Sequence, residues 1–111
     1  RINAGSYSFE CANPRHEHEY HLFETVKVPD GKVLCPGVIT HASNIVEHPE
    51  LIAERIMRFA KLVGRENVIA AADCGFSSQA LYRTEVHDTV VWEKFKAMRQ
   101  GADIASKALW K

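Results

Sequence analysis

The sequence lacks several features that mark specialised proteins. Its 111 residues carry no excess of either charge, since 14 basic side chains balance 14 acidic ones. Proteins that bind nucleic acids or anionic membrane surfaces usually have a basic excess, so neither partner is expected. No apolar run approaches the roughly 20 residues that a membrane helix needs. What remains is the composition of an ordinary globular domain, with 46% hydrophobic and 25% charged residues.

Cysteine is scarce, and its number is odd. Cys11, Cys35 and Cys74 are the three cysteines, and their wide, irregular spacing does not suggest a disulfide framework. We therefore expect reduced thiols and a cytoplasmic location. Taken alone, each cysteine is expected to be a small buried apolar residue.

Short apolar runs alternate with longer amphipathic ones. Strands are predicted at residues 4–10, 32–38 and 67–72. The third run is apolar enough to be buried on both faces, as in a parallel sheet covered by helices. The polar, His-rich segment 14–24 lies between the first two strands, and Pro14 suits a first helical turn.

Two amphipathic helices complete the pattern. The first begins near Pro49 and stops at Gly64. The second begins at Asp88, a good cap residue, and Gly101 inside it should weaken it only modestly. Each has apolar residues at helical spacing on one face, namely Ile52, Ile56, Phe59 and Val63 in the first and Val91, Phe95, Met98, Ala102, Ala105 and Leu109 in the second.

The alternation predicts a single α/β domain over residues 1–111, with parallel strands and right-handed crossovers. Three strand–helix units leave two open sheet edges, which invite pairing. A complete (βα)8 TIM barrel needs about 250 residues. The pattern therefore fits either three units of such a barrel or a module whose edges are covered by another chain.

Polar residues follow each predicted strand, at the ends where α/β folds gather ligands. Glu10 ends the first strand, His41 follows the second, and Asp73 and Cys74 follow the third. Each has a simpler structural interpretation: Glu10 could cap a helix, and Asp73 could form a turn.

Arg15 and His16 precede the polar helix, where backbone donors favour an anionic substrate, although a solvated first turn is an equal alternative. His16, His18 and His21 are spaced by two and three residues, which is poor for a shared metal site on one helical face. We therefore interpret these histidines chiefly as a polar surface or cavity rim.

Three segments carry a family resemblance: SFECANPRHEHE at 8–19, PGVITHASNIVEHPEL at 36–51 and NVIAAADCGF at 67–76. They resemble the last three strand ends of the cobalamin-independent methionine synthase family, closest to its short single-barrel branch with the epoxyalkane–coenzyme M transferase-like proteins. The resemblance covers nearly all of the chain, in order and with matching spacing. It implies the C-terminal portion of a zinc-dependent barrel.

The resemblance implies methyl or alkyl transfer to a thiol such as homocysteine. In that family the zinc ligands are a His-x-Cys pair, a glutamate and the cysteine of a D-C-G motif, and Glu10 and Cys74 match the last two. Zinc would hold the substrate thiol as a thiolate, a good nucleophile at neutral pH. Arg15, His16 and Asp73 are candidate substrate contacts, and His41 lies near a catalytic histidine of the longer synthases.

The chain departs from the family at several positions. It contains no His-x-Cys pair, Thr40 replaces a frequent acidic residue, and His41 is one position away from the family histidine. We expect inactivity alone, with the N-terminal barrel portion as the missing partner. Zinc is expected in a complete barrel, and whether the chain alone binds it stays open.

Two alternatives remain. One is a free-standing, non-catalytic α/β module that self-associates as a homo-oligomer. The other is an oligomer that builds a metal site from Glu10, Cys74 and the histidines of two chains.

Overall fold

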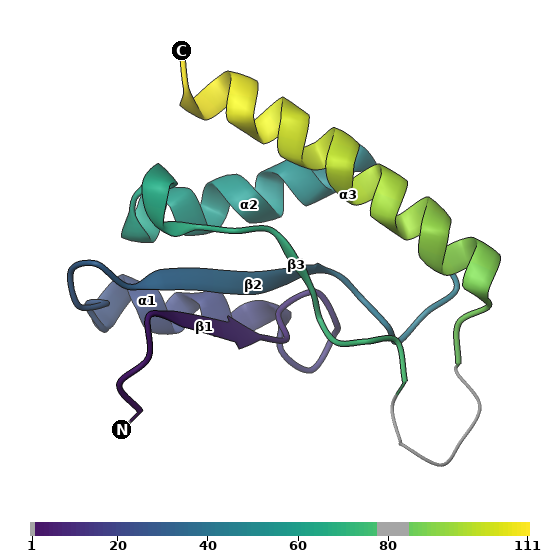
Figure 1. The fold of residues 1–111 in the computed structure, drawn as a ribbon, viewed down its shortest axis with the longest axis horizontal. Helices are drawn as coiled ribbons and strands as arrows, with labels where there is room; N and C mark the ends of the chain where they lie inside the picture. The colour runs from purple at the N-terminus through teal and green to yellow at the C-terminus, as the bar shows by residue number, and fades with distance from the viewer. Residues whose placement is uncertain (1, 78–84) are drawn as a thin grey trace.

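A computed structural model describes residues 2–77 and 85–111 of the chain. Its elements follow one another in the order shown in Figure 1. They are β1 (Ser6–Phe9), the 3-10 helix η1 (Glu17–His21), α1 (Leu22–Thr25), β2 (Val33–Ile39), α2 (Pro49–Val63), the 3-10 helix η2 (Arg65–Asn67), β3 (Ala71–Ala72) and α3 (Asp88–Leu109).

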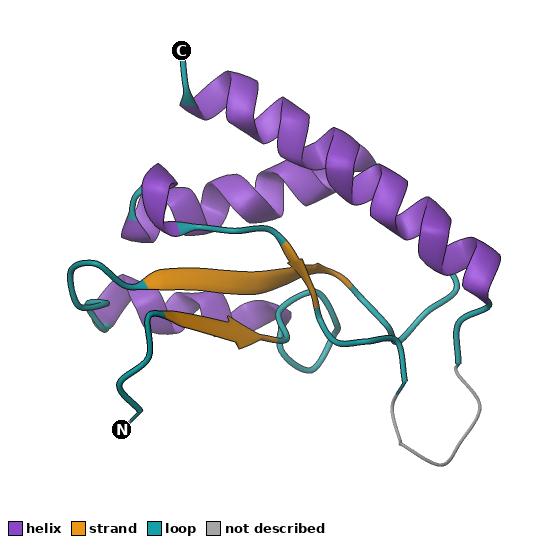
Figure 2. Ribbon diagram, viewed as in Figure 1, coloured by secondary structure: helices purple, strands orange, loops and turns teal. Residues whose placement is uncertain are grey.

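The sheet has three strands in the order β1-β2-β3, and both pairings are parallel (Figure 2). Ser6 pairs with Val33 at one end of the first ladder, and Phe9 pairs with Pro36 at the other. Strands that follow one another in the sequence are therefore neighbours in the sheet, as in consecutive units of a (βα)8 barrel. The predicted α/β fold with parallel strands is confirmed.

The third strand is much shorter than predicted. Of the expected run 67–72, only Ala71–Ala72 forms a strand, and Asn67 belongs to η2. Val68 makes an isolated parallel bridge to Leu34, and the register between β2 and β3 shifts between Gly37 and Ile39. The prediction that this run is buried on both faces is wrong for Ile69, whose exposed fraction is 56%.

Helix α2 joins the two halves of the core. On one side, Phe59 of α2 forms an aromatic trio with Phe9 of β1 and Phe23 of α1, with ring centroids 5.7–5.9 Å apart. On the other side, Ile52 and Ile56 pack with Val38 and Ile39 of β2 and with α3. The predicted apolar faces of both long helices are confirmed as the faces that pack.

Buried Arg55 of α2 makes polar contacts with two elements that precede it in the chain, η1 and β2. Its guanidinium donates to the Val38 carbonyl at 3.1 Å and forms an ion pair with Glu17 of η1 at 3.0 Å. These contacts tie the polar segment that follows β1 to the helix that follows β2. The strand ends are thereby held together by side chains as well as by the backbone ladder.

Helix α3 crosses α2 closely at Gly101. A Cβ added there would lie 2.6 Å from Cβ of Ile52 and 2.8 Å from the Pro49 carbonyl oxygen. This glycine therefore serves helix packing, which sequence propensity alone did not reveal. The helix cap is also displaced from the predicted Asp88, because the His87 side chain accepts a hydrogen bond from the Thr89 amide.

Several large apolar side chains remain exposed. Among them, Trp92 and Trp110 are 66% and 57% exposed. The outer strands β1 and β3 each pair with β2 only, within the part of the chain that the structure describes. Among the same residues, no helix is both long and apolar enough to cross a membrane.

We expect Gly101→Ala to lower the free energy of unfolding. Alanine gains about 1 kcal/mol of helix propensity, but overpacking a tight contact typically costs about 1–3 kcal/mol. Urea unfolding followed by circular dichroism measures the net effect. Gly5→Ala is the control, since a Cβ at Gly5 meets nothing within 4 Å. An unchanged or higher stability of Gly101→Ala would contradict the close crossing.

Candidate functional site

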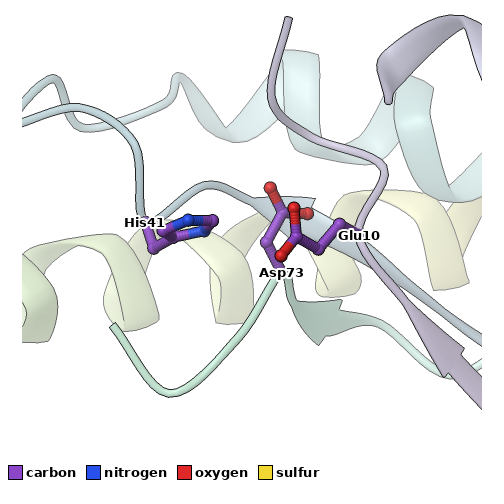
Figure 3. A group of neighbouring side chains, drawn as sticks. All are labelled: Glu10, His41 and Asp73. Carbon is purple, nitrogen blue, oxygen red and sulfur yellow. The ribbon is translucent and has the colours of Figure 1, made fainter. Parts of the chain in front are cut away.

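The three strand ends surround a cavity of about 640 Å³. Five of the six residues singled out in the sequence line it, namely Glu10, Arg15, His16, His41 and Cys74. The sixth, Asp73, is buried and lies beside Glu10 and His41 (Figure 3). The parallel fold thus brings together side chains that are up to 64 positions apart, from Glu10 to Cys74.

Asp73 links the end of β3 to the segment that follows β1. Its Oδ1 accepts hydrogen bonds from the backbone amides of Cys11 and Ala12, both at 2.9 Å. Its Oδ2 accepts from the Asn13 side chain at 2.9 Å. A carboxylate that is engaged by three donors is held as a structural anchor, so Asp73 is poorly placed to act as a free ligand.

Gly37 of β2 makes room for this anchor. A Cβ at Gly37 would lie 1.9 Å from Asp73 Oδ1 and 2.9 Å from the Asp73 Cα. Only a residue without a side chain allows the Asp73 carboxylate to reach across β2 toward the β1 end. The glycine of the PGV segment is therefore explained by a close approach rather than by a turn.

Asn13 is a site residue that the sequence reasoning missed. It is 3% exposed, and its amide nitrogen donates both to Asp73 Oδ2 and to Glu10 Oε2, each at 2.9 Å. Its Oδ1 accepts from the Arg15 amide at 3.0 Å. The Asn-Pro dipeptide was an available signal, since it favours a turn, but the turn does not disclose the two carboxylate partners.

Glu10 is half-buried, and its carboxylate faces the cavity. Besides the Asn13 contact, its Oε2 lies 3.7 Å from Nε2 of His16. His16 also pairs through Nδ1 with Glu19 at 2.9 Å, and this hydrogen bond raises the pKa of His16 above its ordinary value. His16 therefore stays positively charged to a higher pH than a free histidine does. This positive charge lies in the cavity wall, next to the Glu10 carboxylate.

Arg15 is exposed at the same rim and adds a second positive group. The other two histidines of the segment are outside the cavity wall: His18 is exposed, and His21 pairs with Glu24 at 3.0 Å. The shared metal site of His16, His18 and His21, already disfavoured by spacing, is not formed.

His41 enters the cavity from the end of β2. A ring nitrogen of His41 and carboxylate oxygens of Glu10 and Asp73 all lie within 4.8 Å of one another (Figure 3). The Nδ1 atom of His41 is buried and has no hydrogen-bond partner among the described residues. Buried polar atoms are usually paired, so such an atom indicates a place for a ligand.

The segment that carries His41 is held by a buried ion pair. Thr40 precedes His41, and its amide donates to Glu47 Oε2 at 2.6 Å. Lys94 of α3 is fully buried and donates to Glu47 Oε1 and to the Ile45 carbonyl, both at 2.7 Å. The loop from Thr40 to Glu47 is thereby closed on itself and fastened to α3. Neither Glu47 nor Lys94 was singled out from the sequence.

Cys11 and Cys74 lie in different surroundings. Cys11 is buried, and burial, together with the negative charge of Asp73, raises its pKa to about 11. It is therefore a protonated thiol at neutral pH, unsuited to bind a metal. Cys74 is half-buried in the cavity wall, and its sulfur accepts a hydrogen bond from the Phe76 amide at 3.2 Å.

A second hollow of about 350 Å³ lies on the other side of Cys74. Its walls are mainly apolar and include Phe76, Val91, Trp92 and Phe95. Cys74 therefore stands between a polar cavity that contains the carboxylates and an apolar hollow under the start of α3.

The donors at the strand ends suit a zinc ion. Glu10 offers a carboxylate and His41 a buried imidazole nitrogen, and both belong with Asp73 to the group whose donor atoms lie within 4.8 Å of one another. Cys74 is outside that group, but its thiol lines the same cavity. Zinc accepts oxygen, nitrogen and sulfur ligands in mixed sets. The residues present therefore fit the metal that the resemblance implies, with Glu10 and Cys74 placed at one cavity.

Comparison with solved structures gives one strong likeness. The chain superposes on a B12-independent methionine synthase from Shewanella sp. W3-18-1, solved in complex with selenomethionine, with a TM-score of 0.78 and 26% sequence identity. The chain is therefore similar, over nearly its whole length, to one part of a B12-independent methionine synthase. The match covers 97% of this chain but 28% of the Shewanella protein, so the chain spans little more than a quarter of that relative. No family model and no curated protein sequence matches the chain.

The likeness to a methionine synthase explains why the polar residues gather where they do. Consecutive parallel units in sequence order are consistent with a segment of the TIM-barrel-like fold. Ligands of such barrels bind at the C-terminal ends of the strands. Glu10, His41 and Cys74 each follow a different strand at that end.

We expect Lys94→Met to destabilise the protein by about 3–5 kcal/mol, because it leaves the Glu47 carboxylate buried without its partner. Lys96→Met is the matched control on the same helix: Lys96 pairs with Glu93 at the surface, where an ion pair contributes about 0–1 kcal/mol. Chemical denaturation of both variants measures the difference. A Lys94→Met variant as stable as Lys96→Met would refute the structural role of the pair.

Proposed function

We propose that the chain is the C-terminal portion of a zinc-dependent barrel that transfers a methyl or alkyl group to a thiol such as homocysteine. The observation that carries this proposal is the convergence of Glu10 and Cys74 on one cavity in a chain that superposes on a methionine synthase. Glu10 and Cys74 would hold the metal. When bound, zinc lowers the pKa of a thiol, so that the sulfur can attack an alkyl carbon as a thiolate.

The other cavity residues have supporting parts in this proposal. Asp73 and Asn13 fix the segment that presents Glu10, since both carboxylates share the Asn13 amide nitrogen. Arg15 and His16 place positive charge at the rim, where the carboxylate of an amino-acid thiol would be attracted. His41 is the remaining polar side chain that faces Glu10 and Asp73.

A chimera tests this proposal. The chain would replace the segment of the Shewanella methionine synthase on which it superposes, so that the barrel is complete. We expect a folded chimera to bind about one zinc ion per chain and to form methionine from homocysteine. Glu10→Gln and Cys74→Ser should each lower the zinc content, because each removes a proposed ligand. Elemental analysis and a methionine assay measure both properties.

Cys35→Ser is the control for the chimera, because Cys35 lies within β2 and not at a strand end. Circular dichroism shows whether each variant is folded. A folded chimera that binds no zinc would contradict the proposal, as would a zinc content that Glu10→Gln and Cys74→Ser leave unchanged.

Self-association without catalysis is the second candidate, and the open sheet supports it. β1 and β3 are edge strands of the described sheet, and Ile69 beside β3 is exposed. Such edges promote pairing with another chain. For this candidate we expect a native mass spectrum of the chain to show a dimer or a larger assembly without metal. A monomer that stays well folded at high concentration would exclude it.

A further inference from the structure

The proposed function leaves the metal with too few ligands in this chain. Catalytic zinc sites usually have three protein ligands and one position for water or substrate. Glu10 and Cys74 supply two, and the sequence contains no His-x-Cys pair to supply more. A zinc site within this chain therefore needs a third donor.

His41 meets the geometric requirement for that donor. It comes from the end of β2, between the strand ends that carry Glu10 and Cys74. Its ring lies within metal-binding reach of the Glu10 carboxylate, and both side chains point into the same space (Figure 3). Cys74 lines the same cavity, outside the group of Glu10, His41 and Asp73 whose donor atoms lie within 4.8 Å of one another, so its side chain would have to turn toward a bound ion.

The unpartnered Nδ1 atom of His41 is the second observation. It is buried and makes no hydrogen bond within the described chain, although neighbouring polar groups are well paired. Asp73 is close, yet its oxygens already accept from Cys11, Ala12 and Asn13. A buried imidazole nitrogen left without a donor or acceptor is a natural metal ligand, because neutral histidine binds zinc through such an atom.

The backbone at His41 is also held firmly. The amide of Thr40 is bonded to Glu47, which Lys94 anchors to α3. The Ala42 amide donates to the Thr40 side chain at 3.0 Å. A ligand that is fixed on both sides loses little freedom when the metal binds, which favours affinity.

We propose that His41 is a zinc ligand, and that Glu10, His41 and Cys74 form a three-ligand zinc site within this chain alone. This inference rests on the proposed function for the roles of Glu10 and Cys74, and it adds the imidazole. The site takes one ligand from the end of each strand. It needs no second copy of the chain and no His-x-Cys pair.

The test is a titration of the full chain with Co²⁺, a spectroscopic substitute for zinc, followed by competition with Zn²⁺. We expect about one ion per chain and a thiolate-to-cobalt absorption band. His41→Ala should weaken binding by more than about tenfold, since even residues that only support metal ligands change affinity by 10–100-fold. Cys74→Ser should remove the thiolate band, and Glu10→Gln should also weaken binding.

His21→Ala is the matched control, because His21 is exposed and paired with Glu24 away from the cavity. It should bind Co²⁺ as the unaltered chain does. Circular dichroism confirms that each variant is folded, and His41→Cys serves as a second variant. Since cysteine also binds zinc, His41→Cys should recover binding that His41→Ala loses and should strengthen the thiolate band.

Three results would overturn the inference. One is an unaltered chain that binds no Co²⁺ or Zn²⁺. In another, Glu10→Gln and Cys74→Ser abolish metal binding, but the folded His41→Ala variant binds the metal as the unaltered chain does. Glu10 and Cys74 would then be ligands and His41 would not. The third is binding lost in His16→Ala but kept in His41→Ala, which would assign the imidazole to the other histidine of the cavity. The proposed function is judged separately, by the zinc content of the complete chimeric barrel.

Discussion

The site depends first on the carboxylate of Asp73. The third strand has only two residues, so few backbone hydrogen bonds join it to β2. Asp73, which directly follows this strand, reaches across β2 and accepts hydrogen bonds from three donors in the segment after β1. Two of these donors are backbone amides, and a buried amide without an acceptor costs about 1–3 kcal/mol. The hydrogen bonds therefore fix the first strand end relative to the third, and Gly37 is the opening in β2 that permits them.

The second strand end is fastened by a different device. Glu47 and Lys94 form a buried ion pair that contributes little net stability compared with apolar packing, but it becomes costly as soon as one partner is lost. Its effect is to specify a single conformation for the loop around His41. The Asp73 hydrogen bonds fix the ends of β1 and β3 relative to each other, and the ion pair fixes the loop that follows β2. Polar contacts therefore position the cavity residues, whereas apolar side chains form the core.

Sequence reasoning predicted the elements whose signal is local. The apolar faces of α2 and α3 follow from periodicity, and Glu10, His41 and Cys74 were found because each follows a strand. Asn13, Glu47 and Lys94 were missed because their partners lie far away in the sequence. Asn13 bonds to Asp73, 60 positions away, and Glu47 pairs with Lys94, 47 positions away. Lysine in an amphipathic helix normally faces solvent, so the burial of Lys94 has no signature in the pattern. Gly101 and Gly37 likewise depend on what approaches them in space.

The arrangement of ligands in a parallel barrel has a consequence for a chain of this length. Each strand presents one position at the same rim, so donors for one ion are distributed over successive strand ends rather than concentrated in one motif. A segment with three consecutive strands can therefore carry three donors, provided that each strand end is held rigidly. The Asp73 anchor and the Glu47–Lys94 pair both act entirely within the described residues. For that reason the described residues themselves supply the contacts that hold the cavity side chains in place.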